Sequence, residues 1–325
     1  MTATERFEVR FHSGGNRAGN PFRFAGRGSL VIEPDFVTLE GNERRSFRLG
    51  RPASERVRMV DIVNVWTDGE RVQFDQQRVD GDRTIGFSVA NPEVALRIVG
   101  ALPQRRTEAF AAAQADVETF HRQLEHRAST PVVWTLLAVN IAIFALMWQE
   151  NVPDNPLAHG QQLIRWGSNA GRYTLQGEWW RLVTSMFLHG GLLHIAFNMI
   201  VLVQVGTLVE RMFGSLRFTL LYLIAGVCGS LASVLWNPYV NSVGASGAIF
   251  GIIGGLLAFV RKPDSGVPHT IARSLRGSIT FFLLFNVAAG LIYPFTDNAA
   301  HFGGLAGGYI AGWLLARSLS LPPEA

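Results

Sequence analysis

The sequence predicts a polytopic α-helical membrane protein in which a six-helix bundle follows a small soluble β-rich domain. Two observations indicate this fold class. Residues 1–130 hold 19 of the 29 Lys and Arg and 18 of the 25 Asp and Glu, so the rest of the 325-residue chain is poor in charge. That second part also contains long uncharged runs, close to the 17–25 apolar residues that a helix needs to cross a bilayer core.

The change in charge density near Thr130 predicts the domain organisation. We expect a soluble cytoplasmic β-rich domain over residues 1–103, a helical linker over 104–130, a six-span membrane domain over 131–319 and a C-terminal tail over 320–325. Short β-rich runs with turn signals fill the first domain, and Asn91-Pro92 then starts a helix. Strands closed by one C-terminal helix coarsely resemble the pleckstrin-homology-like architecture. An interaction or regulatory module, with an unknown ligand or partner, is the expected role.

Six segments of the second part are long and apolar enough, or nearly so, to cross a membrane. Lipid cannot pair with backbone polar groups, so we expect these segments to be helical. The fourth is short and starts with glycine, which predicts a helix that begins below the membrane surface. The six are Pro131–Trp148, Leu192–Val209, Phe218–Trp236, Gly244–Val260, Gly277–Tyr293 and Ala299–Ala316.

The basic residues predict the orientation of the spans. The loop between the fourth and fifth spans is basic, whereas the loops after the third and fifth contain no Lys or Arg. The positive-inside rule then places both termini in the cytoplasm. The N-terminus also lacks a hydrophobic signal region, so we expect the first domain to stay in the cytoplasm. The basic loop residues are Arg261, Lys262, Arg273 and Arg276.

Polar residues inside membrane spans are costly, which makes them candidates for function. Such residues lie near the start of the second span (His194 and Asn198), the fourth (Ser246) and the sixth (His301). With the N-terminus inside, every even-numbered span runs from the outer to the inner surface. All four residues are therefore expected at a similar depth, about 5–10 Å below the outer surface at 1.5 Å per residue.

Each of these residues alone also has a structural interpretation. A serine among small residues lets helices approach, and a membrane histidine or asparagine can form a structural hydrogen bond. Together they favour chemistry, because one serine and one histidine are the minimum for nucleophilic acyl transfer. His301 is a suitable base for Ser246 near neutral pH. No acidic residue lies at this depth in either span, so we expect a dyad, with Phe250 packed against the imidazole.

The remaining polar groups and glycines suit the same chemistry. His194 and Asn198 are spaced i,i+4, so both project from one helix face, as donors to a developing oxyanion. Small residues form two ridges that allow close contact of the fourth and sixth spans. These ridges consist of Gly247 with Gly251 and Gly304 with Gly308.

At these residues the sequence resembles the rhomboid family of intramembrane serine proteases. Gly244-Ala245-Ser246-Gly247 matches the family's G-x-S-G motif, and Ala300-His301 with Gly304 and Gly308 matches A-H-x-x-G-x-x-x-G. His194 and Asn198 match H-x-x-x-N in the second span. The resemblance covers roughly Pro131 to Leu319 and rests on several separated motifs in the expected order.

The resemblance implies a function. Ser246 is then the nucleophile, His301 the general base, and His194 with Asn198 the oxyanion site. Phe250 stands where the family often has tyrosine. The implied activity is a serine endopeptidase in a bacterial plasma membrane that cuts transmembrane segments of single-span proteins near the extracytoplasmic face. The loop Pro294–Asn298 is expected to cover the site.

Two alternatives remain open from the sequence. One is an inactive rhomboid-like protein that binds membrane helices, although such relatives lose the serine or the histidine. The other is a small transporter, although we find no internal repeats with paired broken helices. No cofactor is expected, and no metal, because no H-E-x-x-H motif occurs and Cys228 is the only cysteine. Mixed rather than segregated charge argues against nucleic-acid binding.

Overall fold

The structure is a computed structural model that describes residues 4–12, 22, 24–43, 51–125, 127–150, 156–292 and 296–321. The chain divides into two compact units, Met1–Gln114 and Ala115–Ala325. The division falls inside helix α2 (Glu108–Glu125), which lies within the linker expected over residues 104–130. The domain boundaries themselves stay predictions.

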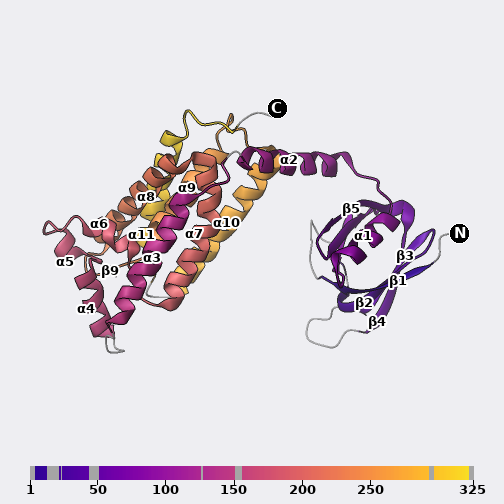
Figure 1. The fold of residues 1–325 in the computed structure, drawn as a ribbon, viewed down its shortest axis with the longest axis horizontal. Helices are drawn as coiled ribbons and strands as arrows, with labels where there is room; N and C mark the ends of the chain where they lie inside the picture. The colour runs from indigo at the N-terminus through magenta and orange to yellow at the C-terminus, as the bar shows by residue number, and fades with distance from the viewer. Residues whose placement is uncertain are drawn as a thin grey trace. The chain divides into compact units, whose positions relative to one another are not determined.

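The N-terminal unit is a seven-stranded antiparallel sheet followed by helix α1 (Pro92–Ala101) (Figure 1). The strands lie in the order β4-β3-β2-β1-β7-β6-β5. The predicted β-rich domain with a C-terminal helix is therefore confirmed at this level, and the finer pleckstrin-homology-like architecture stays a prediction. The strands are β1 (Glu5–Phe11), β2 (Phe24–Ile32), β3 (Phe36–Glu43), β4 (Pro52–Arg58), β5 (Ile62–Asp68), β6 (Arg71–Gln76) and β7 (Arg83–Ser88), with the short helix η1 (Met59–Asp61) before β5.

Alternating side chains explain why these segments form a sheet with one buried face. In β1 the buried Phe7, Val9 and Phe11 alternate with exposed residues, which is the period of two that a half-buried strand requires. Helix α1 starts where the sequence predicted it: the Asn91 side chain accepts a hydrogen bond from the backbone N–H of Val94 at 3.0 Å. The helix buries its apolar face in the same core.

The second unit is helical (Figure 1). Six long helices overlap the six segments predicted from the sequence: α3 (Pro131–Gln149), α7 (Leu192–Phe213), α8 (Ser215–Trp236), α9 (Ser246–Val260), α10 (His269–Ile292) and α11 (Asn298–Leu315). Short elements fill the connection between α3 and α7 and the turn before α9. They are α4 (Pro156–Trp166), β8 (Asn169–Ala170), α5 (Gly171–Thr174), α6 (Arg181–Thr184), η2 (Ser185–Phe187) and β9 (Asn241–Ser242).

By length and composition, three helices of the described residues are able to cross a membrane, namely α3, α7 and α8. Helix α9 is a shorter apolar helix of 15 residues. Helix α10 carries Arg273 and Arg276 near its start, and α11 contains His301 and several glycines. The hydropathy of the described residues thus supports fewer spans than the six expected.

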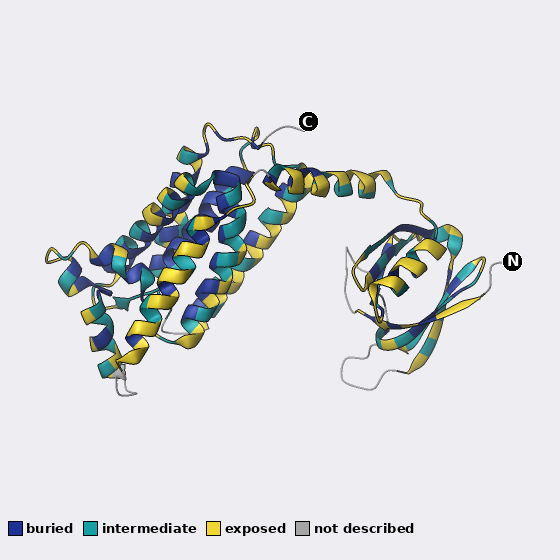
Figure 2. Cartoon of the chain, in the orientation of Figure 1, coloured by how far each residue is buried: buried dark blue, intermediate teal, exposed yellow. Residues whose placement is uncertain are grey.

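Helix α9 lies at the centre of the helical unit, packed against α7, α8 and α11. Thirteen of its 15 residues are buried, as expected of a helix that is apolar on every side (Figure 2). Glycines bring it into backbone contact with α11. A Cβ atom added to Gly304 would collide with the carbonyl oxygen of Gly247, and one added to Gly308 would collide with that of Gly251.

A buried carboxylate joins three of the helices. Glu210 near the end of α7 is 1% exposed and accepts hydrogen bonds from the backbone N–H groups of Val132 (3.1 Å) and Val133 (2.9 Å) in the first turn of α3. It also accepts one from the hydroxyl of Ser215, the first residue of α8, at 2.7 Å. The side chain therefore satisfies backbone donors that a helix N-terminus leaves unpaired.

We expect Glu210→Ala to lower the free energy of unfolding by about 3 kcal/mol or more, because it leaves several buried donors without an acceptor. Glu210→Gln keeps one acceptor oxygen and should cost less. Unfolding of the detergent-solubilised protein measures the effect, with the exposed Glu118→Ala of α2 as the control expected within about 0.5 kcal/mol of wild type. Equal midpoints for Glu210→Ala and wild type would contradict this role.

Candidate active site

Ser246 is the first residue of helix α9, and a sharp turn leads the chain to it. Gly244 has φ of +118°, a backbone conformation that a residue with a side chain rarely adopts. Its backbone N–H donates to the carbonyl oxygen of Ser185 at 2.9 Å, which fixes the turn against η2. The predicted fourth span began at Gly244, whereas the helix starts two residues later because of this turn. The Ser246 side chain is only half-buried.

The Oγ of Ser246 and the Nε2 of His301 are 2.9 Å apart, which is hydrogen-bond distance. His301 lies in the first turn of α11, so the pair forms across the contact between α9 and α11. The glycine contacts described above bring the two backbones close enough for these short side chains to meet. Two residues far apart in the sequence are thereby brought together as predicted.

The imidazole of His301 is held by an aromatic ring. Phe250 lies one turn after Ser246 on α9, and its ring is stacked on that of His301 with centroids 4.2 Å apart and planes 6° apart. On α10, Phe282 contacts Phe250 at a centroid distance of 5.6 Å. Phe250 is 4% exposed, so its own position is fixed by packing. Stacking on the fixed ring of Phe250 therefore orients the imidazole of His301.

Asp297 is the acidic residue nearest to His301 in the sequence, and its carboxylate is engaged elsewhere. It accepts hydrogen bonds from the backbone N–H of Ala300 at 2.9 Å and from the hydroxyl of Ser233 at 2.5 Å. Among the hydrogen bonds of the described residues, none joins this carboxylate to the imidazole of His301. Asp297 thus caps α11 and connects it to Ser233 of α8.

His194 and Asn198 approach the site from α7. The backbone N–H of Gly190 donates to Nδ1 of His194 at 3.4 Å, so Nε2 carries the proton in the neutral ring. This Nε2 lies 2.7 Å, and Nδ2 of Asn198 3.9 Å, from the position a Cβ atom would take on Gly244. Both donors therefore face the backbone just before Ser246. No direct hydrogen bond to Ser246 is formed by either residue in the part of the chain that the structure describes.

His189 packs against His194. Its ring contacts that of His194 edge-on, with centroids 5.1 Å apart, and it is 2% exposed. Burial, with a smaller contribution from His194, lowers the pKa of His189 to about 3, so the ring is neutral at physiological pH. It therefore packs against His194 without carrying charge.

Some residues that build the site were not predicted from the sequence. Helix α8 contributes Ser233, which binds Asp297, and Gly229, where an added Cβ atom would lie 2.8 Å from the carbonyl oxygen of Ala300. The spacing of Asp297 before Ala300 is an N-cap signal that was available in the sequence. The predicted covering loop Pro294–Asn298 lies partly outside the described residues, since these exclude residues 293–295.

Comparison with known proteins identifies the family. A family model described as the Rhomboid domain matches residues 176–318. Rhomboid protease AarA of Providencia stuartii is 32% identical over 214 residues, which cover 58% of this chain and 73% of AarA. This chain belongs to the rhomboid family. The resemblance predicted from the sequence motifs is therefore confirmed, and this rhomboid is a multi-pass membrane protein.

Other relatives match a smaller share of their own length. Rhomboid protease GluP of Bacillus subtilis is 40% identical over 189 residues, which cover 58% of this chain and 35% of GluP. RHOMBOID-like protein 4 of Arabidopsis thaliana is 37% identical over 171 residues, which cover 51% of this chain and 42% of the relative. This rhomboid thus spans less than half of either relative. Its N-terminal sheet lies outside residues 176–318, the part that matches the family model.

Proposed function

We propose that this rhomboid is an intramembrane serine endopeptidase that cuts transmembrane segments of single-span membrane proteins near the extracytoplasmic face. The observation that carries the proposal is the 2.9 Å contact between Oγ of Ser246 and Nε2 of His301 in a member of a protease family. Serine is a weak nucleophile until a base accepts its proton, and the stacked imidazole is positioned to do so.

The proposed reaction follows from these two groups. Nε2 of His301 takes the hydroxyl proton of Ser246 as Oγ attacks the scissile carbonyl carbon, and the carbonyl oxygen becomes an oxyanion. The C–N bond then breaks, and the imidazolium gives its proton to the leaving amine. Water, activated by the same imidazole, hydrolyses the acyl-enzyme ester and regenerates the serine. No cofactor or metal is required for this sequence of steps.

In this proposal His194 and Asn198 donate hydrogen bonds to the oxyanion. Nε2–H of His194 and the amide of Asn198 face the turn at Gly244, beside the backbone N–H of Ser246 at the start of α9. Asn198 uses one amide hydrogen for the carbonyl oxygen of His194, at 2.9 Å, and keeps the second free for substrate. Helix N-termini favour negative charge, so the backbone contributes in the same direction.

His194→Ala and Asn198→Ala are each expected to lower kcat about 10²–10³-fold, because a preorganised oxyanion donor contributes on the order of 3 kcal/mol. The measurement is the initial cleavage rate at saturating substrate. Asn140→Ala of α3 is the matched control: its amide makes the same intrahelical bond, to the carbonyl oxygen of Leu136 at 2.7 Å, and its loss should leave kcat unchanged. Wild-type cleavage rates for both His194→Ala and Asn198→Ala would show that these residues do not stabilise the oxyanion.

The stacked ring gives a separate prediction. Phe250→Ala is expected to lower kcat about 10–100-fold, because the imidazole loses its orientation and a fraction of molecules leaves the geometry that the reaction needs. Phe250→Tyr keeps the ring and should stay within about threefold of wild type. Because the ring positions the base and does not touch substrate, we expect KM to change little in both variants. A Phe250→Ala enzyme with the wild-type kcat would show that packing does not position His301.

The proposal also includes a topology of six spans with both termini in the cytoplasm. Helices α7, α9 and α11 then enter the membrane from the same side, so that Ser246, His301 and the oxyanion donors lie at one depth. Arg261, Lys262, Arg273 and Arg276 lie between α9 and the middle of α10, on the side assigned to the cytoplasm. Both AarA and GluP are bacterial, which agrees with a bacterial plasma membrane as the location.

The test is cleavage of a single-span substrate by the purified full chain in liposomes. We expect two fragments, with the cut placed by mass spectrometry within about two helical turns, about 11 Å, of the extracytoplasmic end of the substrate helix. An intact substrate that co-purifies with the rhomboid would instead support the alternative, an inactive helix-binding protein. A cut at the cytoplasmic end would contradict the proposed topology.

A further inference from the structure

Three arginines of the N-terminal sheet lie in one cross-strand row. Arg10 of β1 is directly opposite Arg27 of β2 on one side and Ser88 of β7 on the other, and Ser88 is directly opposite Arg71 of β6. Directly opposed residues project from the same face of a sheet. The neighbours of Arg10 in β1, Val9 and Phe11, are buried, so the row lies on the outer face. All three arginines are exposed.

This row is unfavourable for folding as it stands. Like charges directly opposite each other on a sheet destabilise it, and Arg10 and Arg27 form such a pair. Ion pairs relieve this elsewhere in the same unit, but none of the described residues forms one with Arg10, Arg27 or Arg71. Ion pairs among the described residues of this unit join Arg6 with Glu40, Arg56 with Glu33, Arg58 with Asp61, Arg78 with Asp80, Arg83 with Glu55 and Arg97 with Glu5.

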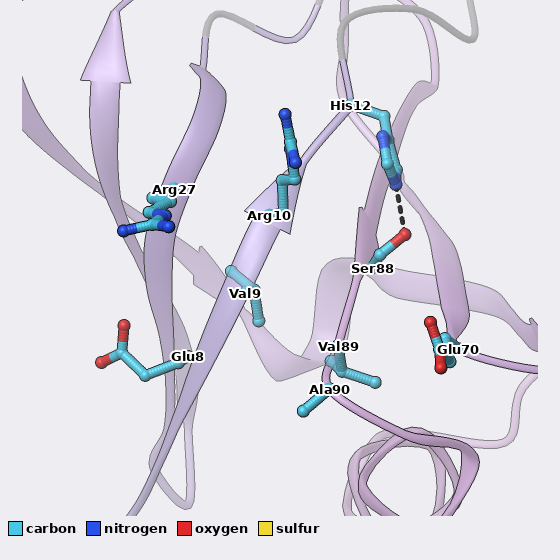
Figure 3. A pocket seen from close by; sticks show the side chains of 9 residues that line it. All are labelled: Glu8, Val9, Arg10, His12, Arg27, Glu70, Ser88, Val89 and Ala90. Atoms are coloured by element: carbon cyan, nitrogen blue, oxygen red, sulfur yellow. Dashed lines mark hydrogen bonds between the residues drawn. The ribbon is translucent and has the colours of Figure 1, made fainter.

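The row borders a hollow in the surface. Arg10, Arg27, Ser88 and His12 line a cavity of about 780 Å³ (Figure 3). Nε2 of His12 lies 2.5 Å from the hydroxyl of Ser88, and Arg71 borders a smaller adjoining cavity that also includes His12. Burial, followed by the charges of Arg71 and Arg10, lowers the pKa of His12. The positive field of the row therefore extends over the imidazole.

Two carboxylates belong to the same cavity and restrict what it can hold. In Figure 3 the carboxylates of Glu8 and Glu70 lie apart from the guanidinium of Arg10 and the imidazole of His12. An anionic group would therefore bind at the Arg10 and His12 end. The carboxylates of Glu8 and Glu70 lie on opposite sides of the view in Figure 3, and because they accept hydrogen bonds, each suits a hydroxyl group of the same ligand. The cavity volume is also within the range of small-molecule sites, about 300–1,000 Å³.

We propose that Arg27, Arg10, Ser88 and Arg71, together with His12, form a binding site for the phosphate group of a hydroxyl-bearing ligand. Guanidinium groups bind phosphate oxygens through paired, charge-assisted hydrogen bonds, and a phosphate dianion would offset two of the three positive charges that the protein leaves unpaired in this row. The phosphate can come from a lipid headgroup or from a soluble compound, because both present the same chemistry. The site is independent of the proposed peptidase reaction.

Arginine modification tests the site in the full chain. The protein, in nanodiscs of phosphatidylcholine, is treated with phenylglyoxal, and the labelling rate of each arginine is read by peptide mass spectrometry. We expect pyrophosphate to slow labelling of Arg10 and Arg27 at least threefold if the ligand is soluble. If the ligand is a lipid, nanodiscs that contain phosphatidylinositol phosphate should slow the labelling of the same two arginines. Arg56, already paired with Glu33, serves as the internal control and should not change.

Two outcomes would overturn the proposal. One is unchanged labelling of Arg10 and Arg27 with both pyrophosphate and the phosphorylated lipid. The other is equal protection of Arg56, which would indicate general screening of charge. As a second measurement, Arg27→Gln should weaken pyrophosphate binding, or lipid-dependent protection of Arg10, about tenfold, whereas Arg56→Gln should not. Both side chains are exposed, so neither variant is expected to disturb the core.

Discussion

Ser246→Ala is expected to lose cleavage of a single-span substrate by about 10³-fold or more, because removal of the nucleophile from a serine hydrolase leaves only the contribution of binding and the oxyanion donors. The initial rate of fragment formation in liposomes, at matched protein content, is the measurement. The variant should fold as wild type does, since it removes one half-buried hydroxyl whose partner, His301, is held independently by Phe250.

Ser242→Ala is the matched control for this experiment. It is half-buried in β9, four residues before Ser246, and has no role in the proposed chemistry. We expect wild-type cleavage from Ser242→Ala and a wild-type unfolding midpoint from Ser246→Ala. If Ser246→Ala cuts the substrate at the wild-type rate, the proposed mechanism is wrong, whatever the fold of the family.

Gly308→Ala should lower the free energy of unfolding by about 3 kcal/mol or more and also abolish cleavage. A Cβ atom at this position would collide with the carbonyl oxygen of Gly251 in α9. Backbone atoms cannot rotate away, so α9 and α11 must separate, and overpacking of this kind typically costs about 1–3 kcal/mol even where side chains can adjust. Separation also pulls His301 away from Ser246. Thermal unfolding in detergent and the cleavage rate measure both effects.

Gly277→Ala in α10 is the matched control. It makes the same chemical change in a helix of the same unit, but nothing lies within 4 Å of its added Cβ atom. Because alanine is the better helix former by about 1 kcal/mol, this variant should be neutral or slightly stabilised. If Gly308→Ala were as stable as Gly277→Ala, the close contact of α9 and α11 would not be what positions the dyad.

The positions of Ser246 and His301 were predictable because topology and motif spacing act over the whole chain. Successive spans run in opposite directions, so the second, fourth and sixth predicted spans all start at the same membrane surface. Glycines spaced by four residues allow the fourth and sixth of these helices to touch. Phe250 followed from helical periodicity relative to Ser246. These inferences need no knowledge of side-chain conformation, which is why they agree with the geometry.

Other features depend on contacts that no local pattern encodes. Glu210 bonds to the start of α3, more than 70 residues away, and Asp297 bonds to Ser233 on α8. The start of α9 at Ser246 depends on the turn at Gly244.

In the N-terminal sheet, the row of arginines depends on strand register. Arg10 is paired with Arg27 and with Ser88, and Ser88 with Arg71, across four strands that are not all consecutive in the sequence. Such pairings cannot be read from alternation alone, because alternation fixes the face of a residue but not its partner. The sequence therefore predicted the sheet but not the site on it.

The central claim is that Ser246 is a nucleophile activated by His301, and covalent labelling tests it without knowledge of the substrate. The purified full chain is treated with a fluorophosphonate, and the modified residue is located by peptide mass spectrometry. We predict one adduct, on Ser246, that is lost in His301→Ala while that variant remains folded. An adduct confined to another serine, or equal labelling of Ser246 in His301→Ala, would contradict the account.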